Sequence, residues 1–374
     1  MKSSVKLILL VCAVVVAAGA LLPFVGAREP FRADKSPYRF ENVAQYDSQR
    51  AYLPAPRWER LRTPEQAGWS SKRLEDAGAF ARDIHSDALL VVYNGLVVLD
   101  HGDPAAKYSL HSVRKSLMSV MVGIYNDKGK LDTNATLKEL GIDDREGLSE
   151  KEKQATVTDL LTSRSGVYHP AAYETRGMRE RRPERGAYQA GEHWFYNNWD
   201  FNTLVTIFNE QTGEDFFEAF ESALAKPLGM EHFRLEDTRY RYEEDKSVHP
   251  AYLFRMSAAD LARIGLLYLR EGKFNGRQIV SKDWIDRSTS AIHEWDEDRP
   301  GAGYGYMWKV TKDGYYAAGR GGQRLYVVPK YNLVIVHLAD TRGGKRVKNS
   351  DVARLYRMIL AAYQPEKKIS AATQ

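Results

Sequence analysis

Two short apolar runs follow each other directly near residue 90. Residues 88–93 and 96–100 are rich in valine and leucine, and only Asn94 and Gly95 separate them. Asn-Gly tolerates the left-handed backbone conformation at both central positions of a tight turn, so this pattern predicts a two-residue β-hairpin. Neither run alternates between apolar and polar residues, and we therefore expect the hairpin to be covered on both of its faces.

From Ser112 onward, apolar residues recur at intervals of three and four, which is the spacing of one face of an α-helix. Gly129 is the expected end of this helix, because glycine readily adopts the left-handed conformation that follows many helices. Capping-box pairs predict two further helix starts, at residues 156–159 and 257–260. The apolar face of the first helix would consist of Val113, Leu117, Val120, Met121 and Ile124.

The end of the chain returns to short β-rich runs, followed by a helical pattern over residues 347–363. Turns as short as those between the runs require antiparallel pairing. The sequence thus predicts an α/β fold, with one antiparallel sheet of about five or more strands built from both chain ends and covered by helices. A second, mostly helical lobe would span roughly residues 130–250, and a cleft between lobes is a usual place for a small-molecule site. The predicted late strands cover residues 306–311, 315–318, 325–328 and 333–338.

The first 27 residues have the composition of an export signal. Two lysines precede an apolar run over residues 7–22, and the small residues Gly26 and Ala27 follow it. This order predicts a cleaved signal peptide, with an uncleaved membrane anchor through residues 7–27 as the alternative. We therefore expect a periplasmic or secreted protein, or one anchored to the inner membrane. The rest of the chain divides into a predicted extended arm (28–65), one main domain (66–365) and a tail (366–374).

Composition narrows the chemistry available to the main domain. Cys12 is the single cysteine and lies in the apolar N-terminal run, so the remaining chain can form neither a disulfide nor a thiolate metal site. A net charge of +5 over 374 residues does not suggest a nucleic-acid partner. The nine histidines show no metalloprotease spacing and no phosphate-binding loop is present, so we predict no metal and no cofactor. The arginine-rich residues 176–185 suggest a solvated loop or, alternatively, a basic rim that attracts an anionic substrate.

Ser112 and Lys115 form an S-x-x-K motif at the start of the predicted helix. Residues three apart lie on the same helix face, so the hydroxyl and the amine can meet. A serine hydroxyl needs a base to become a nucleophile, and a lysine amine can serve if burial lowers its pKa. The backbone N–H groups at a helix N-terminus could also stabilise an oxyanion. The alternative is a capped helix with a solvated lysine.

Two further segments carry candidate site residues. Tyr196 could join the proton relay, because a nearby cation lowers the pKa of a phenol, and Asn198 could contact the substrate and orient Lys115 through its amide oxygen. Both could instead belong to an aromatic core. In residues 319–323 (GRGGQ), the glycines would let a substrate approach a strand edge, and the N–H of Gln323 could be an oxyanion donor. A glycine-rich hairpin bend is the alternative reading of that segment.

Taken in order, these segments resemble the serine β-lactamase and DD-peptidase superfamily, most closely its class C β-lactamase-like branch with esterases and 6-aminohexanoate-dimer hydrolases. The resemblance runs from about Thr63 to Tyr363 and includes segments around each motif. It implies that residues 66–365 form a β-lactamase-like serine hydrolase domain. The matching segments are YSLHSVRKS (108–116), ATVTDLLTSRSG (155–166), RMSAADLARIG (255–265), GRGGQ (319–323) and VVP (327–329).

The resemblance also implies roles for individual residues. Ser112 would be the nucleophile, Lys115 its partner, and Tyr196 the base that also activates the deacylating water. Asn198 would contact the substrate, as would Arg320 and Gly322 of the third segment. The backbone N–H groups of Ser112 and Gln323 would form the oxyanion hole.

Two departures from the family pattern affect the substrate. The third segment usually carries Lys or His followed by Thr or Ser and Gly, whereas Arg320-Gly321-Gly322 stands here without a hydroxyl. An ester or amide, small or peptidic, is therefore a better candidate than a β-lactam or a DD-carboxypeptidase substrate, although Arg320 could bind an anion bidentately. In the second departure, Ala190-Gly191 replaces the Pro-Gly that usually precedes the second motif.

The competing hypothesis is a non-catalytic protein that binds peptidoglycan or a partner. The sequence specifies no oligomeric state.

Overall fold

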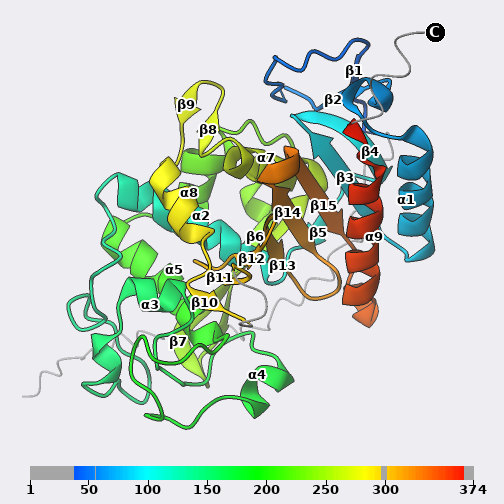
Figure 1. Cartoon of the computed structure of the whole chain (residues 1–374). Helices are drawn as coiled ribbons and strands as arrows, with labels where there is room; N and C mark the ends of the chain where they lie inside the picture. The colour runs from blue at the N-terminus through cyan, green and yellow to red at the C-terminus, as the bar shows by residue number, and fades with distance from the viewer. Residues whose placement is uncertain (1–37, 55, 296–300, 366–374) are drawn as a thin grey trace, which may run out of the picture. The chain divides into compact units, whose positions relative to one another are not determined.

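The computed structural model describes residues 38–365 except residue 55 and residues 296–300 (Figure 1). The predicted signal or anchor (1–27), the start of the arm and the tail (366–374) lie outside the described residues. In the described part, ten strands form one sheet in the order β1-β2-β4-β3-β15-β14-β13-β12-β11-β10. These strands are β1 (Glu41–Val43), β2 (Glu59–Leu61), β3 (Ala88–Tyr93), β4 (Leu96–Gly102), β10 (His293–Glu294), β11 (Gly303–Tyr304), β12 (Lys309–Thr311), β13 (Gly314–Ala318), β14 (Arg324–Val328) and β15 (Leu333–Leu338).

Both chain ends contribute to this sheet, as predicted. β15, from the end of the chain, pairs antiparallel with β3, and β3 pairs with β4 through the expected hairpin. Asn94 (φ 49°) and Gly95 (φ 86°) both adopt the left-handed conformation that this turn requires. The one departure from antiparallel pairing is at the edge, where β2 pairs parallel with β1 and with β4. The predicted arm thus contains two short strands that extend the sheet.

Every residue of β3 is buried, because helices cover both faces of the sheet. Leu90 and Val92 belong to the core cluster that includes α2 and α7, whereas Leu89 and Val91 belong to the cluster that includes α1 and α9. Figure 1 shows α1 and α9 side by side, in agreement with their direct packing. The nine α-helices of the described part are α1 (Ser71–Asp83), α2 (Val113–Asp127), α3 (Val157–Leu161), α4 (Arg176–Glu180), α5 (Asn198–Thr212), α6 (Phe216–Phe220), α7 (Ala258–Leu269), α8 (Lys282–Ser288) and α9 (Asn349–Ala362).

The middle of the chain is helical, but less completely than predicted. A second sheet, β5-β7-β6, includes the hairpin of β6 (Thr238–Glu243) and β7 (Ser247–Ser257). Its third strand, β5 (Lys107–Ser109), runs directly into the segment that holds Ser112. A further small hairpin joins β8 (Lys273–Phe274) and β9 (Arg277–Gln278). The β6/β7 strands alternate between buried and exposed residues only in part, which explains why their pattern gives a weak strand signal.

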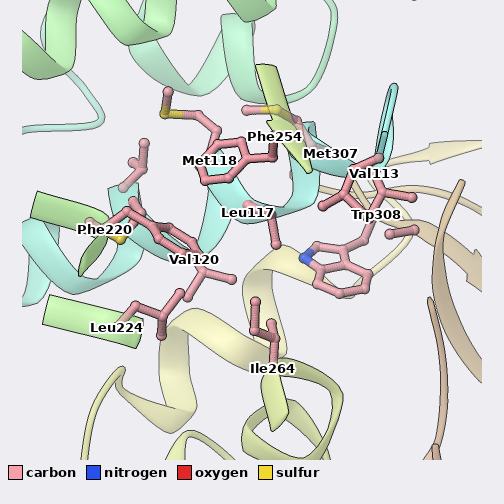
Figure 2. Close-up of a cluster of buried hydrophobic side chains, with 14 of the residues drawn as sticks. Val113, Leu117, Met118, Val120, Phe220, Leu224, Phe254, Ile264, Met307 and Trp308 are labelled. Carbon is pink, nitrogen blue, oxygen red and sulfur yellow. The ribbon is translucent and has the colours of Figure 1, made fainter. Parts of the chain in front are cut away.

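Helix α2 lies in the centre of the core. The sequence predicts one apolar face, but all residues from Val113 to Tyr125 are buried, including the polar ones. Figure 2 shows Val113, Leu117 and Val120 of α2 among side chains from α7 and from the residues before β12. A helix packed on all sides holds its first turn in a fixed position. The site described below is built on that turn.

Helix starts agree with the sequence in most details. The reciprocal capping box of Thr156 and Asp159 is present at α3. At α7, Ser257 accepts from the Asp260 N–H, but the Asp260 carboxylate accepts from the backbone N–H groups of Glu231 and His232 instead of closing the box. The late strand predicted over residues 306–311 begins only at Lys309, because Tyr306–Trp308 form a buried turn with Met307 at φ 61°.

Candidate active site

Ser112 lies at the N-cap position of α2, and its hydroxyl makes no capping hydrogen bond. The residue before it, His111, has a left-handed backbone (φ 47°), which is uncommon for a non-glycine residue and marks a sharp turn into the helix. Its ring nitrogens bond to Tyr173 OH (2.9 Å) and Thr341 Oγ1 (2.7 Å). This turn leaves the Ser112 side chain partly exposed at the end of a rigid helix.

Lys115 lies one turn further along α2 and connects the other two predicted catalytic side chains. Its Nζ donates to Ser112 Oγ at 3.2 Å and to Tyr196 OH at 2.6 Å. The lysine is only 2% exposed, and its amine lies over the rings of Tyr196 and Phe201, 4.1 Å and 4.3 Å from their centroids. The structure therefore brings Ser112, Lys115 and Tyr196 together within hydrogen-bonding reach.

Burial controls the protonation of both partners of the serine. It lowers the pKa of Lys115 well below its usual value, and the charges of Arg114 and Lys309 lower it further. Burial also raises the pKa of Tyr196 to about 12, although its hydrogen bond with Ser112 and the charge of Arg114 act in the opposite direction. A neighbouring cation, Arg114, does lower the phenol pKa, but the loss of solvent outweighs it. Burial thus shifts both groups towards their uncharged forms, an amine and a phenol.

Backbone bonds on both sides fix the position of Tyr196. The Phe195 N–H donates to Ser163 O at 2.9 Å, and the Gly191 N–H donates to Arg164 O at 2.8 Å. On the other side, Asn197 caps α5 by accepting from the Trp199 N–H at 3.1 Å. Asparagine is a favourable N-cap, so the middle residue of the Y-x-N segment holds its first residue in place. The sequence analysis assigned no role to Asn197.

Asn198 is buried in the first turn of α5, and its amide group is turned away from the expected partner. Its Nδ2 donates to the carbonyls of Tyr173 (2.8 Å) and Ala172 (3.3 Å). Its Oδ1 has no hydrogen-bond partner within the described residues, so the expected bond to Lys115 is not formed. The contacts to residues 172 and 173 instead hold the loop that carries the Tyr173 ring against His111.

The GRGGQ segment packs directly beside the turn that holds Ser112. A side chain at Gly319 would meet Leu110 O at 2.4 Å, and Gln323 Nε2 donates to Ser109 O at 2.8 Å. The same amide is bonded to Ala339 through both its oxygen and its nitrogen, which fixes the loop. In the described part of the chain, the N–H groups of Ser112 and Gln323 take part in no backbone hydrogen bond, so both can donate to a ligand.

The two remaining residues of this segment differ in their surroundings. Gly322 is buried with φ 101°, its carbonyl accepts from His337 Nδ1 at 2.8 Å, and an added Cβ would lie 3.0 Å from Val347. Backbone conformation and the packing of the next loop therefore both require glycine here, and its contact with a substrate stays a prediction. Arg320 is exposed and close enough to His111 for its charge to lower the pKa of that histidine.

Arg114 is a part of the site that the sequence analysis missed. It lies between Ser112 and Lys115 in the chain, it is 1% exposed, and its guanidinium lies 4.6 Å from the Tyr252 ring centroid. Its Nη2 donates to Asn202 Oδ1 at 3.4 Å, and its Nε has no partner among the described residues. A permanent cation in the centre of a buried site disfavours protonation of the neighbouring amine. Arg114 directly precedes Lys115 in the sequence, and this position alone could have indicated that its charge affects the lysine.

The described residues offer neither a cluster of metal ligands nor a membrane-spanning helix. No group of three or more His, Cys, Asp or Glu side chains is arranged there to hold a metal ion. Of the helices in the same residues, none has the length and apolar character needed to cross a membrane.

One family model and one relative match large parts of the chain. The family model described as Beta-lactamase matches residues 71–357 of the chain. An uncharacterized protein of Alkalihalophilus pseudofirmus is 24% identical over 267 residues, which cover 63% of this chain and 74% of the relative.

Solved structures share the fold at low sequence identity. A candidate 6-aminohexanoate-dimer hydrolase from Bacillus anthracis superposes with a TM-score of 0.61 at 20% identity, covering 88% of this chain and 89% of that one. A penicillin-binding protein homologue from Caulobacter crescentus gives a TM-score of 0.57 at 13% identity, covering 78% and 97%. Proteins of this fold are generally serine hydrolases. The chain belongs to the Beta-lactamase family, within the superfamily of serine β-lactamases and DD-peptidases.

Proposed function

We propose that this protein is a serine hydrolase that cleaves an ester or amide through an acyl-enzyme on Ser112. One observation carries the proposal: the Lys115 amine is bonded to both Ser112 Oγ (3.2 Å) and Tyr196 OH (2.6 Å). The amine is buried and, within the described residues, pairs with no carboxylate. A structural lysine would normally be neutralised by an acidic partner, whereas a general base must stay neutral.

In the acylation step, Ser112 Oγ attacks the carbonyl carbon of the substrate and its proton passes to the Lys115 amine. The tetrahedral oxyanion would accept hydrogen bonds from the N–H groups of Ser112 and Gln323. When the intermediate collapses, the proton moves from the Lys115 ammonium through the Tyr196 hydroxyl to the leaving alcohol or amine. Because burial favours the phenol over the phenolate, we assign the base to Lys115 and the proton-relaying group to Tyr196.

Deacylation would use the same groups in the reverse direction. A water molecule attacks the acyl carbonyl while its proton passes through Tyr196 to Lys115. The acid leaves and Ser112 Oγ recovers the proton. Export to the periplasm through the N-terminal segment remains part of the proposal, as does the preference for esters and amides over β-lactams, which rests on the missing hydroxyl at Gly321.

A fluorophosphonate probe tests the central step. The wild-type protein is expected to gain one probe mass, located on Ser112 by peptide mapping. Ser112→Ala should gain none, and Ser116→Ala is the matched control, because Ser116 lies on the same helix with its hydroxyl donating to Met307 O at 2.7 Å. Folded wild-type protein without a label on Ser112 would refute the proposal. A panel of 4-nitrophenyl esters, nitrocefin and D-Ala-D-Ala peptides then identifies the substrate class.

A further inference from the structure

A row of side chains crosses four neighbouring strands next to the candidate active site. The strand registers pair His293 with Tyr304, Tyr304 with Lys309, and Lys309 with Tyr316. Residues directly opposite each other in antiparallel strands project from the same face of the sheet. These four side chains therefore share one face at the edge of the large sheet.

This row is in contact with the catalytic groups. The Tyr304 ring lies 6.2 Å from the Tyr196 ring, centroid to centroid. Trp194, two residues before Tyr196, stacks on His293 at 5.0 Å and lies 5.8 Å from Trp295. The charge of Lys309 also reaches Lys115, because it lowers the pKa of that amine. The row therefore connects Lys309 with the Tyr196 ring through Tyr304.

A cavity of about 360 Å³ lies over the row, with Trp295, Lys309 and Tyr316 among its lining residues. The Lys309 amine lies 5.1 Å from the Trp295 ring centroid and 5.9 Å from that of Tyr316. Trp295 is 47% exposed and supplies an apolar wall of the cavity. Flat apolar walls with one cationic group are the usual composition of a site for a small organic anion.

The Lys309 amine has no acidic partner among the residues that the structure describes. Burial together with the charge of Arg324 lowers its pKa. Lysines that are partly buried usually have an anionic partner, since an unpaired buried charge is costly. The contacts with two aromatic rings compensate only in part. An anion bound in the cavity would pair with the amine.

We propose that this cavity is a substrate subsite, and that the substrate is an ester or amide carrying a carboxylate that pairs with Lys309 while its hydrocarbon part lies between Trp295 and Tyr316. This inference rests on the proposed hydrolase function and adds the substrate class. Arg320 is not among the residues that line the cavity, so the proposed contact with Lys309 differs from any anion contact of Arg320.

The test compares esters that differ only in the carboxylate. 4-Nitrophenyl hydrogen glutarate and 4-nitrophenyl pentanoate place the charge on the acyl side, and 4-acetoxybenzoate and phenyl acetate place it on the leaving group. We expect the anionic ester of one pair to be favoured in kcat/KM, and Lys309→Met to reduce that preference on the order of tenfold or more. The pair that responds identifies the side on which the subsite lies.

Three variants make the outcome specific. Lys309→Arg keeps the charge and should retain most of the preference, which a purely structural role for Lys309 would not predict. Lys312→Met removes an exposed lysine of the same hairpin and should leave the preference unchanged. Thermal melting checks that each variant is folded. If Lys309→Met melts early, the Lys309→Arg and wild-type proteins are compared for the competitive inhibition of neutral-ester hydrolysis by glutarate.

The two proposals fail in different ways. If the wild-type and Lys309→Met proteins both hydrolyse the esters and show the same preference between the anionic and the neutral ester, the subsite is refuted and the hydrolase function stands. Failure of the fluorophosphonate to label Ser112, together with no turnover of any ester, would overturn the hydrolase. In that case, calorimetric titration of the wild-type protein with glutarate still decides the subsite, because saturable binding lost in Lys309→Met supports it and no binding refutes it.

Discussion

Replacing Tyr196 by phenylalanine removes one oxygen atom from the relay and preserves the ring. The ring packs between Phe201 and Tyr304, with centroid distances of 4.9 Å and 6.2 Å, so the fold around it should persist. The lost hydroxyl is the nearest hydrogen-bond partner of Lys115, at 2.6 Å. With Tyr196→Phe, the proton has no short path from the amine to the leaving group.

The expected loss in kcat/KM is roughly 100- to 10,000-fold, the usual contribution of one general acid–base group. This corresponds to about 3–5 kcal/mol of transition-state stabilisation. The effect on folding should be much smaller, about 1 kcal/mol, because one buried hydrogen bond is lost and no cavity larger than an oxygen is left. Function and stability should therefore separate clearly in this variant.

The assay measures kcat/KM for a 4-nitrophenyl ester, the rate of fluorophosphonate labelling and the thermal midpoint in the same preparation. Tyr268→Phe is the matched control, because its buried hydroxyl accepts from Trp308 Nε1 at 3.3 Å, away from Lys115. The control should lose comparable stability and keep its activity within about threefold. A Tyr196→Phe variant that keeps more than about a tenth of the wild-type kcat/KM would refute the proton relay.

Four further outcomes follow from the geometry around Ser112. Because the Arg114 cation lowers the pKa of Lys115, Arg114→Met should move the acid limb of the kcat/KM profile to higher pH, and an unchanged limb would contradict this. Lys115→Met should abolish activity but stabilise the fold in denaturant titrations, since the lowered pKa of Lys115 reflects a cost of burying its ammonium form. The pKa of His111 is lowered to about 4 by burial, Arg320 and Arg114, so the unfolded chain binds the extra proton between pH 6.5 and 4. Stability should fall over that window by up to about 3 kcal/mol, and His111→Asn should flatten the decrease. Gly322→Val should cost about 1–3 kcal/mol and lower kcat more than KM, measured by melting and ester kinetics.

The sheet could be predicted because its signals are local. Apolar runs bounded by turn residues predicted the positions of β3, β4, β14 and β15 closely. For β3 and β4, the two-residue turn at Asn94 also fixes which strands pair. Strand pairings between distant segments of the chain could not be predicted as well from the sequence. The parallel addition of β2 to β4 depends on the path of the weakly patterned chain before α1, and three residues per strand carry too little periodicity to show it.

The candidate site was predictable in its members and only partly in its interactions. Spacing alone places Ser112 and Lys115 on one helix face, but the third member, Tyr196, is 81 residues away from Lys115 in the sequence, and only the family resemblance connected them. Sequence spacing cannot predict the direction in which the Asn198 amide points. The side chain of Asn198 bonds to carbonyls of residues 172 and 173, and those carbonyls belong to a loop whose path depends on tertiary packing.

The protonation of the relay shows most clearly what depends on tertiary structure. An S-x-x-K motif at the start of an exposed helix would hold a charged lysine, which is no base. Here α2 is buried on every side, so Lys115 loses its solvent, while Arg114 from the same turn and Lys309 from a distant strand add positive charge. The same enclosure raises the pKa of Tyr196, which makes the phenol a carrier of protons and leaves the amine to accept them. If Lys309 also binds the carboxylate of the substrate, the anion would offset part of the positive charge and raise the proton affinity of Lys115 when the substrate is in place, so substrate binding and base strength would be coupled.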